Sequence, residues 1–248
     1  MIGLLEDVAL ATQFLTRVPM PFKGLNHARL SRASAWFPVV GLVIGEFAAL
    51  CYKFLMPHLG RTLNSLAVVL FMILLTGGLH EDGLADCADA FGGGWTREDR
   101  LRILKDSRIG TYGAVALIFS VSSRVLLLAT IPVSSLMSYL VCAQVLARWT
   151  PLPLSAILRP ARGPEGQGGR MAGTTSWLTV ALGSLLALGP VIYLLRFSAW
   201  EPLLAILVLS ALSGLYYRRR LGGITGDCMG ATIQISEIAL YLCGAWVR

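Results

Sequence analysis

The chain has 248 residues, of which 55% are hydrophobic and only 14% charged, and its mean hydropathy is +0.68. Soluble domains carry about 25% charged residues, and disordered chains have too few apolar residues to fold, so this composition excludes both classes. The net charge of +7 does not by itself indicate a nucleic-acid partner. We therefore predict an all-α, polytopic integral membrane protein.

The first residues predict a helix that lies at the membrane surface. The apolar segment 2–15 is too short to span a bilayer and is interrupted by two acids and a glutamine. Its remaining apolar side chains share one helix face, and Pro19 and Pro21 end the segment. Acidic residues stand where a signal peptide needs positive charge, so we expect no cleavable targeting segment.

Seven longer apolar stretches follow, and each predicts a transmembrane helix of about 17 to 22 residues. They cover residues 36–56, 63–79, 110–130, 135–154, 176–195, 201–217 and 225–246. The five cysteines are scattered without a CxxC motif, which predicts small apolar core residues rather than disulfides or a zinc site. We expect one membrane-embedded domain over residues 1–248.

Lys and Arg residues are distributed unevenly between the two ends of these spans. Of the 21, 15 fall in the N-terminal segment and in the loops 80–109, 155–175 and 218–224, against 3 on the opposite side. Positive charge accumulates on the cytoplasmic side of membrane proteins, so we expect the N-terminus and these loops in the cytoplasm. Contact with anionic lipid then explains the basic charge, and no nucleic-acid partner is needed.

The loop after the second span gathers four of the 14 acidic residues within nine positions. Asp82, Asp86 and Asp89 are spaced i, i+4 and i+7, so a continuing helix places them on one face. Carboxylates that repel one another are stabilised by a cation, and oxygen ligands favour Mg²⁺ or Mn²⁺ over zinc. We predict a metal site at these three residues with Glu81. A solvated acidic helix end is the alternative, although charge at the mouth of a bilayer helix is usually functional.

The same loop carries candidates for phosphate binding. Gly92 and Gly93 allow the backbone to approach a phosphate closely, although a glycine run also fits a plain helix stop. Lys105, Ser107 and Arg108 precede the third span, and their side chains suit a phosphate-rich anion.

Charged residues also fall inside the predicted spans. Glu46, Arg124 and Arg148 lie within them, and Asp227 begins the last one. One interpretation is an ion pair between Glu46 and an arginine that orients the helices, and another is the ion pathway of a transporter. Asp227 is expected at the membrane level of the acidic cluster, where a further carboxylate could complete a two-ion site.

Several motifs that cover nearly the whole chain in order resemble one family. They are Phe-Leu-Thr-Arg-Val-Pro at 14–19, Trp-Phe-Pro-Val-Val-Gly at 36–41, the run 80–89, Lys-Asp-Ser-Arg-Ile-Gly-Thr at 105–111 and Gly-Ile-Thr-Gly-Asp at 223–227. The chain resembles the adenosylcobinamide-GDP ribazoletransferases, also called cobalamin-5′-phosphate synthases. The resemblance implies a catalytic domain in the inner membrane of a bacterium or archaeon. Such an enzyme joins adenosylcobinamide-GDP to α-ribazole or its 5′-phosphate, releases GMP and requires Mg²⁺.

This resemblance suggests roles for the candidate residues. Asp82, Asp86 and Asp89, with Asp227, are expected to hold Mg²⁺ at the pyrophosphate, while Lys105 and Arg108 neutralise phosphate charge. A carboxylate of the cluster or His80 is expected to take the proton of the attacking ribose hydroxyl, and the residues do not choose between them. The flexible segment 161–170 fits either a lid or a plain connector, and a homo-oligomer is left open.

Two other functions are weighed against this one. Asp82-Gly83 also resembles the start of the motif of membrane CDP-alcohol phosphotransferases, which act on lipids. However, Asp86 departs from that motif, and its downstream Gly-x-x-x-Asp-x-x-x-Asp is missing. An ion-coupled transporter is expected to carry its acids near mid-span, whereas this cluster lies at one mouth.

Overall fold

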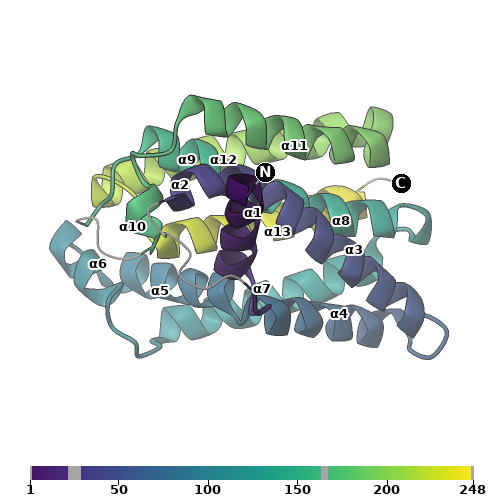
Figure 1. The fold of residues 1–248 in the computed structure, drawn as a ribbon. Helices are drawn as coiled ribbons and strands as arrows, with labels where there is room; N and C mark the ends of the chain where they lie inside the picture. The colour runs from purple at the N-terminus through teal and green to yellow at the C-terminus, as the bar shows by residue number, and fades with distance from the viewer. Residues whose placement is uncertain (1, 22–28, 163–166, 247–248) are drawn as a thin grey trace.

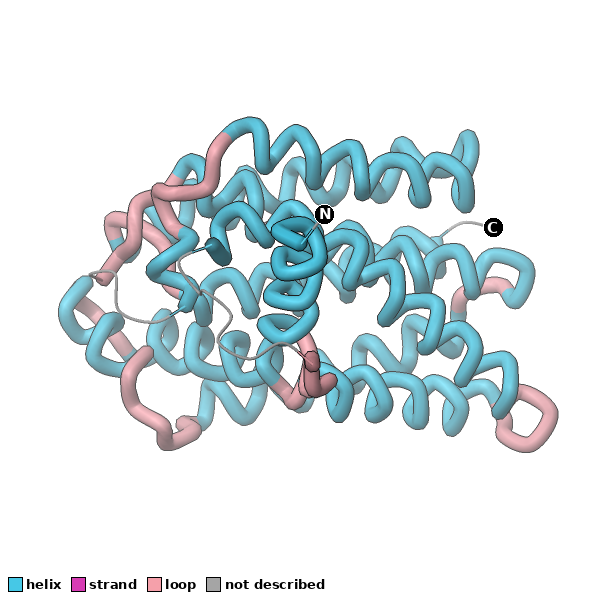
Figure 2. Tube along the Cα trace, viewed as in Figure 1, coloured by secondary structure: helices cyan, strands magenta, loops and turns pink. Residues whose placement is uncertain are grey.

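The protein is a bundle of long helices with shorter ones gathered at one end (Figures 1 and 2). The structure is a computed structural model that describes residues 2–21, 29–162 and 167–246. Within these residues, the only β-type pairing is a single parallel bridge between Pro160 and Ile224. The predicted all-α class is therefore confirmed.

The helices follow one another along the chain with short connections. Their order is α1 (Ile2–Leu15), α2 (Leu30–Ala33), η2 (Ser34–Trp36), α3 (Phe37–Leu55), α4 (Arg61–Thr76), α5 (Leu79–Gly93), α6 (Arg97–Ile103), α7 (Thr111–Thr130), α8 (Val133–Trp149), α9 (Pro151–Ile157), α10 (Gln167–Met171), α11 (Trp177–Leu195), η3 (Arg196–Ala199), α12 (Trp200–Leu221) and α13 (Gly226–Trp246).

In the described part of the chain, five helical stretches are long and apolar enough to cross a membrane, and the number rises to six if the bent pair of α4 and α5 is one span. Many of their large apolar side chains are exposed, as expected for a surface that meets lipid. The longest stretch, Trp177–Leu221, contains both α11 and α12, joined by a turn at Arg196. A polytopic membrane protein is thus confirmed, whereas the count of seven spans stays a prediction.

Helix α13 lies at the centre of the bundle, where it packs against α5, α7, α8 and α12. Glycines allow helices to approach at the level of their backbones, as is common between membrane helices. A Cβ at Gly41 or Gly45 of α3, for example, would overlap backbone atoms of α8. Close packing of this kind fixes the positions of the polar side chains between the helices.

Helix α1 spans the predicted residues 2–15 and crosses the long helices steeply (Figure 1), the orientation of a helix in the membrane surface. Asp7 holds it to the following segment through ion pairs with Arg29 at 2.9 Å and with Arg32 at 2.8 Å. The ring of Phe14 stacks on that of Phe37 with 5.4 Å between centroids.

The second predicted span does not continue straight into the acidic segment. The chain bends by 90° between α4 and α5 at Gly77 and Gly78, which have φ angles of 69° and 71°. Only glycine adopts this left-handed conformation without steric cost, and the amide of Gly78 donates to the carbonyl of Ile73 to close the helix end. The expectation of a helix that continues from the second span is corrected. The acids lie on a separate helix, α5, whose axis is bent by 90° from that of α4.

Candidate active site

A cavity of about 330 Å³, here called the Asp227 cavity, opens between α5, the start of α13 and the segment before α10. Its polar lining consists of His80, Asp82, Arg162, Thr225 and Asp227. Apolar residues of α1, α3 and α13 complete the wall. The acidic helix and the last helix therefore meet at one cavity, as the sequence predicts for Asp227.

A glycine contact brings the two acidic helices together. A Cβ at Gly83 of α5 would lie 2.8 Å from the carbonyl oxygen of Asp227 and 3.1 Å from its Cα, so the two backbones touch. The neighbouring Asp82 carboxylate therefore reaches the same cavity as that of Asp227. Thr225 donates a hydrogen bond of 3.2 Å to Asp227 and fixes that side chain.

The acids of the cavity and their neighbours on α5 repel one another. Asp82, Asp227 and Asp89 lie near enough to Asp86 to repel its carboxylate, and Arg162 is near enough to attract it. None of the ion pairs among the described residues uses Asp82, Asp86 or Asp227. Within those residues, no three Asp, Glu, His or Cys side chains converge as a ready-made ligand set. Asp82 and Asp227 thus line the cavity, whereas Asp86 lies near both of them but outside the lining.

Asp89 has a different role from its neighbours on α5. Its two carboxylate oxygens accept hydrogen bonds from the backbone amides of Gly110 at 2.7 Å and Gly113 at 2.9 Å. These amides belong to the first turn of α7, whose own N-cap residue provides no side-chain hydrogen bond. Asp89 therefore caps α7 from another helix and joins α5 to it.

Glu81, predicted as a metal ligand, lies in a buried ion cluster instead. Its Oε1 accepts hydrogen bonds from Arg124 at 2.9 Å and from Gln234 at 3.0 Å. Arg124 also pairs with Glu237 at 3.4 Å, and Arg148 pairs with Glu237 at 3.4 Å. Both arginine side chains are 1% exposed, so this cluster locks α5, α7, α8 and α13 together.

The predicted ion pair between Glu46 and an arginine is wrong. Glu46 is exposed on α3, while Arg124 and Arg148 take their acidic partners from α5 and α13. Charges in a low-dielectric interior pair with the nearest acid that packing supplies, and α3 turns Glu46 away from them. The arginines therefore belong to a closed structural network.

The glycine run is the end of a helix rather than a phosphate loop. Gly92 and Gly93 lie in the last turn of α5, where helix hydrogen bonds occupy their amides. A Cβ at Gly92 would lie 2.6 Å from the ring of Tyr112, so this glycine makes room for the first turn of α7. The helix stop that the sequence left open is the observed outcome.

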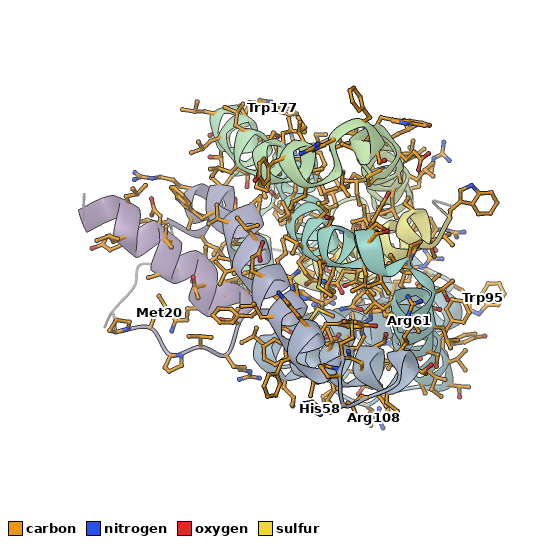
Figure 3. The ribbon with its side chains drawn as sticks, turned by 90° about the vertical axis from the view of Figure 1, so that its right-hand side faces the viewer. Met20, His58, Arg61, Trp95, Arg108 and Trp177 are labelled. Carbon is orange, nitrogen blue, oxygen red and sulfur yellow. The ribbon has the colours of Figure 1, made fainter. Side chains whose placement is uncertain are left out.

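Lys105, Ser107 and Arg108 lie exposed on the loop between α6 and α7, outside the lining of the Asp227 cavity. The Arg108 side chain is 87% exposed, pairs with Asp106 at 2.8 Å and lies at the outer edge of the bundle (Figure 3). The hydrogen bonds and charge of Arg108 lower the pKa of Asp106 to about 2. The Arg108 guanidinium is thus already occupied by a carboxylate.

Arg162 is the cation at the cavity that the sequence did not single out. One of its terminal nitrogens donates to the carbonyl of Leu101 at 3.0 Å, and its buried Nε has no partner among the described residues. In the sequence, Arg162 is one of many basic loop residues. The bridge between Pro160 and Ile224 places it next to the start of α13. Residues 163–166 of the segment that fits either a lid or a connector lie outside the described residues.

Comparisons with known proteins identify the family of the chain. The family model described as cobalamin-5-phosphate synthase matches residues 7–245. Curated relatives named adenosylcobinamide-GDP ribazoletransferase include one from a Shewanella strain, 36% identical over 94% of this chain and 90% of the relative. Another, from Vibrio cholerae, is 36% identical over 96% of this chain and 92% of the relative. One from Ralstonia pickettii is 36% identical over 96% of this chain and 94% of the relative. No solved structure matches the chain.

Proposed function

Because the chain belongs to the cobalamin-5-phosphate synthase family, we propose that it joins adenosylcobinamide-GDP to an α-ribazole acceptor and releases GMP. The chain is an enzyme, an adenosylcobinamide-GDP ribazoletransferase. The observation that carries the proposed chemistry is the Asp227 cavity, where carboxylates from α5 and α13 meet the guanidinium of Arg162. Such a set suits a pyrophosphate held between a metal cation and an arginine.

We propose that Mg²⁺, or Mn²⁺ in its place, binds at Asp82, Asp86 and Asp227. These residues offer only oxygen donors, and Mg²⁺ commonly takes one or two carboxylates and completes its shell with water and substrate phosphate. A site whose carboxylates do not converge by themselves fits that mode of binding. When bound, the cation stabilises negative charge on the reacting phosphate oxygens. Asp89 and Glu81 are left out of this proposal because α7 and Arg124 occupy them.

In the proposed reaction, a ribose hydroxyl of the acceptor attacks the phosphorus that carries the cobinamide ester. The new phosphorus–oxygen bond forms as the bond to the bridging oxygen breaks, and GMP leaves with that oxygen. Since the 5′-oxygen is blocked in the phosphorylated acceptor, the 3′-hydroxyl is the common nucleophile. Its proton passes to a carboxylate of the cavity, because Asp82 is exposed whereas His80 is only 2% exposed. Arg162 neutralises charge on the phosphate oxygens.

We also propose that the protein lies in the inner membrane of a bacterium with the Asp227 cavity at the cytoplasmic side. The basic last turn of α12, with Arg218, Arg219 and Arg220, and the arginine-rich helix α6 pack at that end of the bundle. This arrangement supports the cytoplasmic orientation, since positive charge accumulates there. Nucleotide substrates are also found on that side.

The test uses the purified full-length chain in liposomes with adenosylcobinamide-GDP, α-ribazole 5′-phosphate or α-ribazole, and Mg²⁺, with GMP release as the readout. We expect the rate of GMP release to fall about 100-fold or more in each of three variants, Asp82→Asn, Asp86→Asn and Asp227→Asn. This is the usual effect of removing a group that stabilises transition-state charge. EDTA should stop the reaction, and added Mg²⁺ should restore it. Glu98→Gln is the control, because Glu98 is an exposed acid on α6. Near-normal GMP release by the three Asn variants in correctly inserted protein would refute the assignment.

A further inference from the structure

A second cavity, here called the Arg17 cavity, is also lined by Asp82 and has a volume of about 510 Å³. Its polar side chains are those of Gln13, Thr16, Arg17, Thr76 and Asp82. It shares Asp82, as well as Phe14 and Leu79, with the Asp227 cavity. Asp82 therefore stands where two polar cavities meet.

Arg17 is held in this cavity by its backbone and by the bend between α4 and α5. Its amide donates a hydrogen bond of 2.8 Å to the carbonyl of Leu75, the last turn of α4. Its side chain lies over Gly77, where any Cβ would overlap the arginine stem. The bend that aims α5 at the Asp227 cavity thus also fixes Arg17 beside Asp82.

The charge of Arg17 has no partner in the described part of the chain. No hydrogen bond or ion pair there uses its guanidinium, whereas Arg29 and Arg32, the next arginines along the chain, both pair with Asp7. A guanidinium beside hydroxyl and amide side chains is suited to a phosphate monoester, which it binds through two parallel hydrogen bonds. Arg17 is therefore available to a ligand.

We propose that Arg17 binds the 5′-phosphate of a phosphorylated ribazole acceptor and thereby determines acceptor specificity, an inference that rests on the proposed function. The attacking and leaving oxygens of a phosphoryl transfer lie roughly in line on opposite sides of phosphorus. Two cavities that meet at Asp82 supply this arrangement. The acceptor enters from the Arg17 cavity, and the GDP part of the donor lies in the Asp227 cavity with Arg162. The 5′-phosphate itself undergoes no bond change.

The experiment measures steady-state GMP release from the full-length chain in liposomes with two acceptors, α-ribazole 5′-phosphate and α-ribazole. Arg17→Met keeps the apolar stem over Gly77 and removes the charge. Arg17→Lys keeps the charge but cannot donate the two parallel hydrogen bonds of a guanidinium. Arg102→Ala removes one exposed positive charge from α6 and serves as the matched control.

For Arg17→Met, we expect the KM for α-ribazole 5′-phosphate to rise about 10- to 100-fold, the effect of losing charge-assisted hydrogen bonds to phosphate. The KM for α-ribazole and for adenosylcobinamide-GDP should stay near the wild-type values, which also shows that the variant is folded. Arg17→Lys should give an intermediate rise, and Arg102→Ala should change none of these constants.

Equal effects of Arg17→Met on both acceptors, no effect on either, or a raised KM for the donor alone would overturn this inference. A wild-type enzyme that does not favour the phosphorylated acceptor would overturn it as well. In all four results the wild type still releases GMP, so the proposed function stands. Absence of GMP release by the wild type with both acceptors would instead refute the proposed function itself.

Discussion

The contact between Gly83 and the backbone of Asp227 makes the geometry of the candidate active site sensitive to a single methyl group. In Gly83→Ala, the new Cβ would lie 2.8 Å from the carbonyl oxygen of Asp227, whereas ordinary contacts of a Cβ begin at 3.4 Å. Both partners are helix backbone, which cannot rotate away as a flexible side chain does. Helices α5 and α13 must therefore separate by about 0.6 Å at this point.

This shift predicts losses of both stability and rate. Overpacking of a tightly packed interior costs about 1–3 kcal/mol, and a displacement approaching 1 Å at a reacting centre costs up to about 100-fold in rate. We expect Gly83→Ala to lower the thermal unfolding temperature in detergent micelles and to reduce kcat for GMP release by about tenfold or more. The loss should fall on kcat because, in the proposed reaction, Asp82 and Asp227 act on the same phosphate and the shift would move them apart.

Gly230→Ala is the matched control for this prediction, since Gly230 lies on α13 at the same helix contact. A Cβ there would lie 3.4 Å from the Cα of His80 and 3.5 Å from the carbonyl oxygen of Leu79, which are ordinary contacts. We expect this variant to keep turnover near that of the wild type. Equal behaviour of Gly83→Ala and Gly230→Ala, with wild-type kcat and melting temperature for both, would refute the reasoning.

Three further variants separate structural charges from functional ones. Arg124→Met leaves Glu81 and Glu237 buried without their shared partner and should cost about 3–5 kcal/mol of stability, measured by unfolding in detergent, with partial recovery when Glu81→Gln is added. Asp89→Ala removes the cap of α7 and should cost about 0.5–2 kcal/mol in the same assay, and an unchanged melting temperature would show that the cap is dispensable. Arg108→Ala should keep turnover within about twofold, since exposed ion pairs contribute little, and a tenfold loss would assign Arg108 to the substrate.

Features that depend on local sequence are predicted well. The interfacial segment 2–15 and the spans 110–130 and 176–195 agree with α1, α7 and α11 to within a residue or two, because the length of an apolar run sets the length of a membrane helix. The sequence predicts Asp227 and Asp82 at the same membrane level, and both line the Asp227 cavity.

Features that depend on contacts between distant segments are not predicted. Glu81 has the same sequence surroundings as Asp82, but the helix turns it toward Arg124, which lies 43 positions further along the chain. Arg162 looks like any basic loop residue until the bridge to Ile224 brings it beside α13. The 90° bend depends on two glycines that the hydropathy pattern includes in one continuous span.

The distinction between structural and functional acids therefore rests on whether packing provides a partner. Glu81 and Glu237 share the buried Arg124, and Asp89 accepts two backbone hydrogen bonds, so the folded chain itself compensates their charges. Asp82 and Asp86 have no such partner among the described residues, yet they lie on the same helix, Asp82 in the lining of the cavity and Asp86 near Asp82 and Asp227. Uncompensated carboxylates that repel one another cost stability, and a bound cation with its phosphate ligand removes that cost. In the proposed function, the bound cation and phosphate would thus compensate the charges of Asp82 and Asp86, as arginines and backbone amides compensate those of Glu81, Glu237 and Asp89.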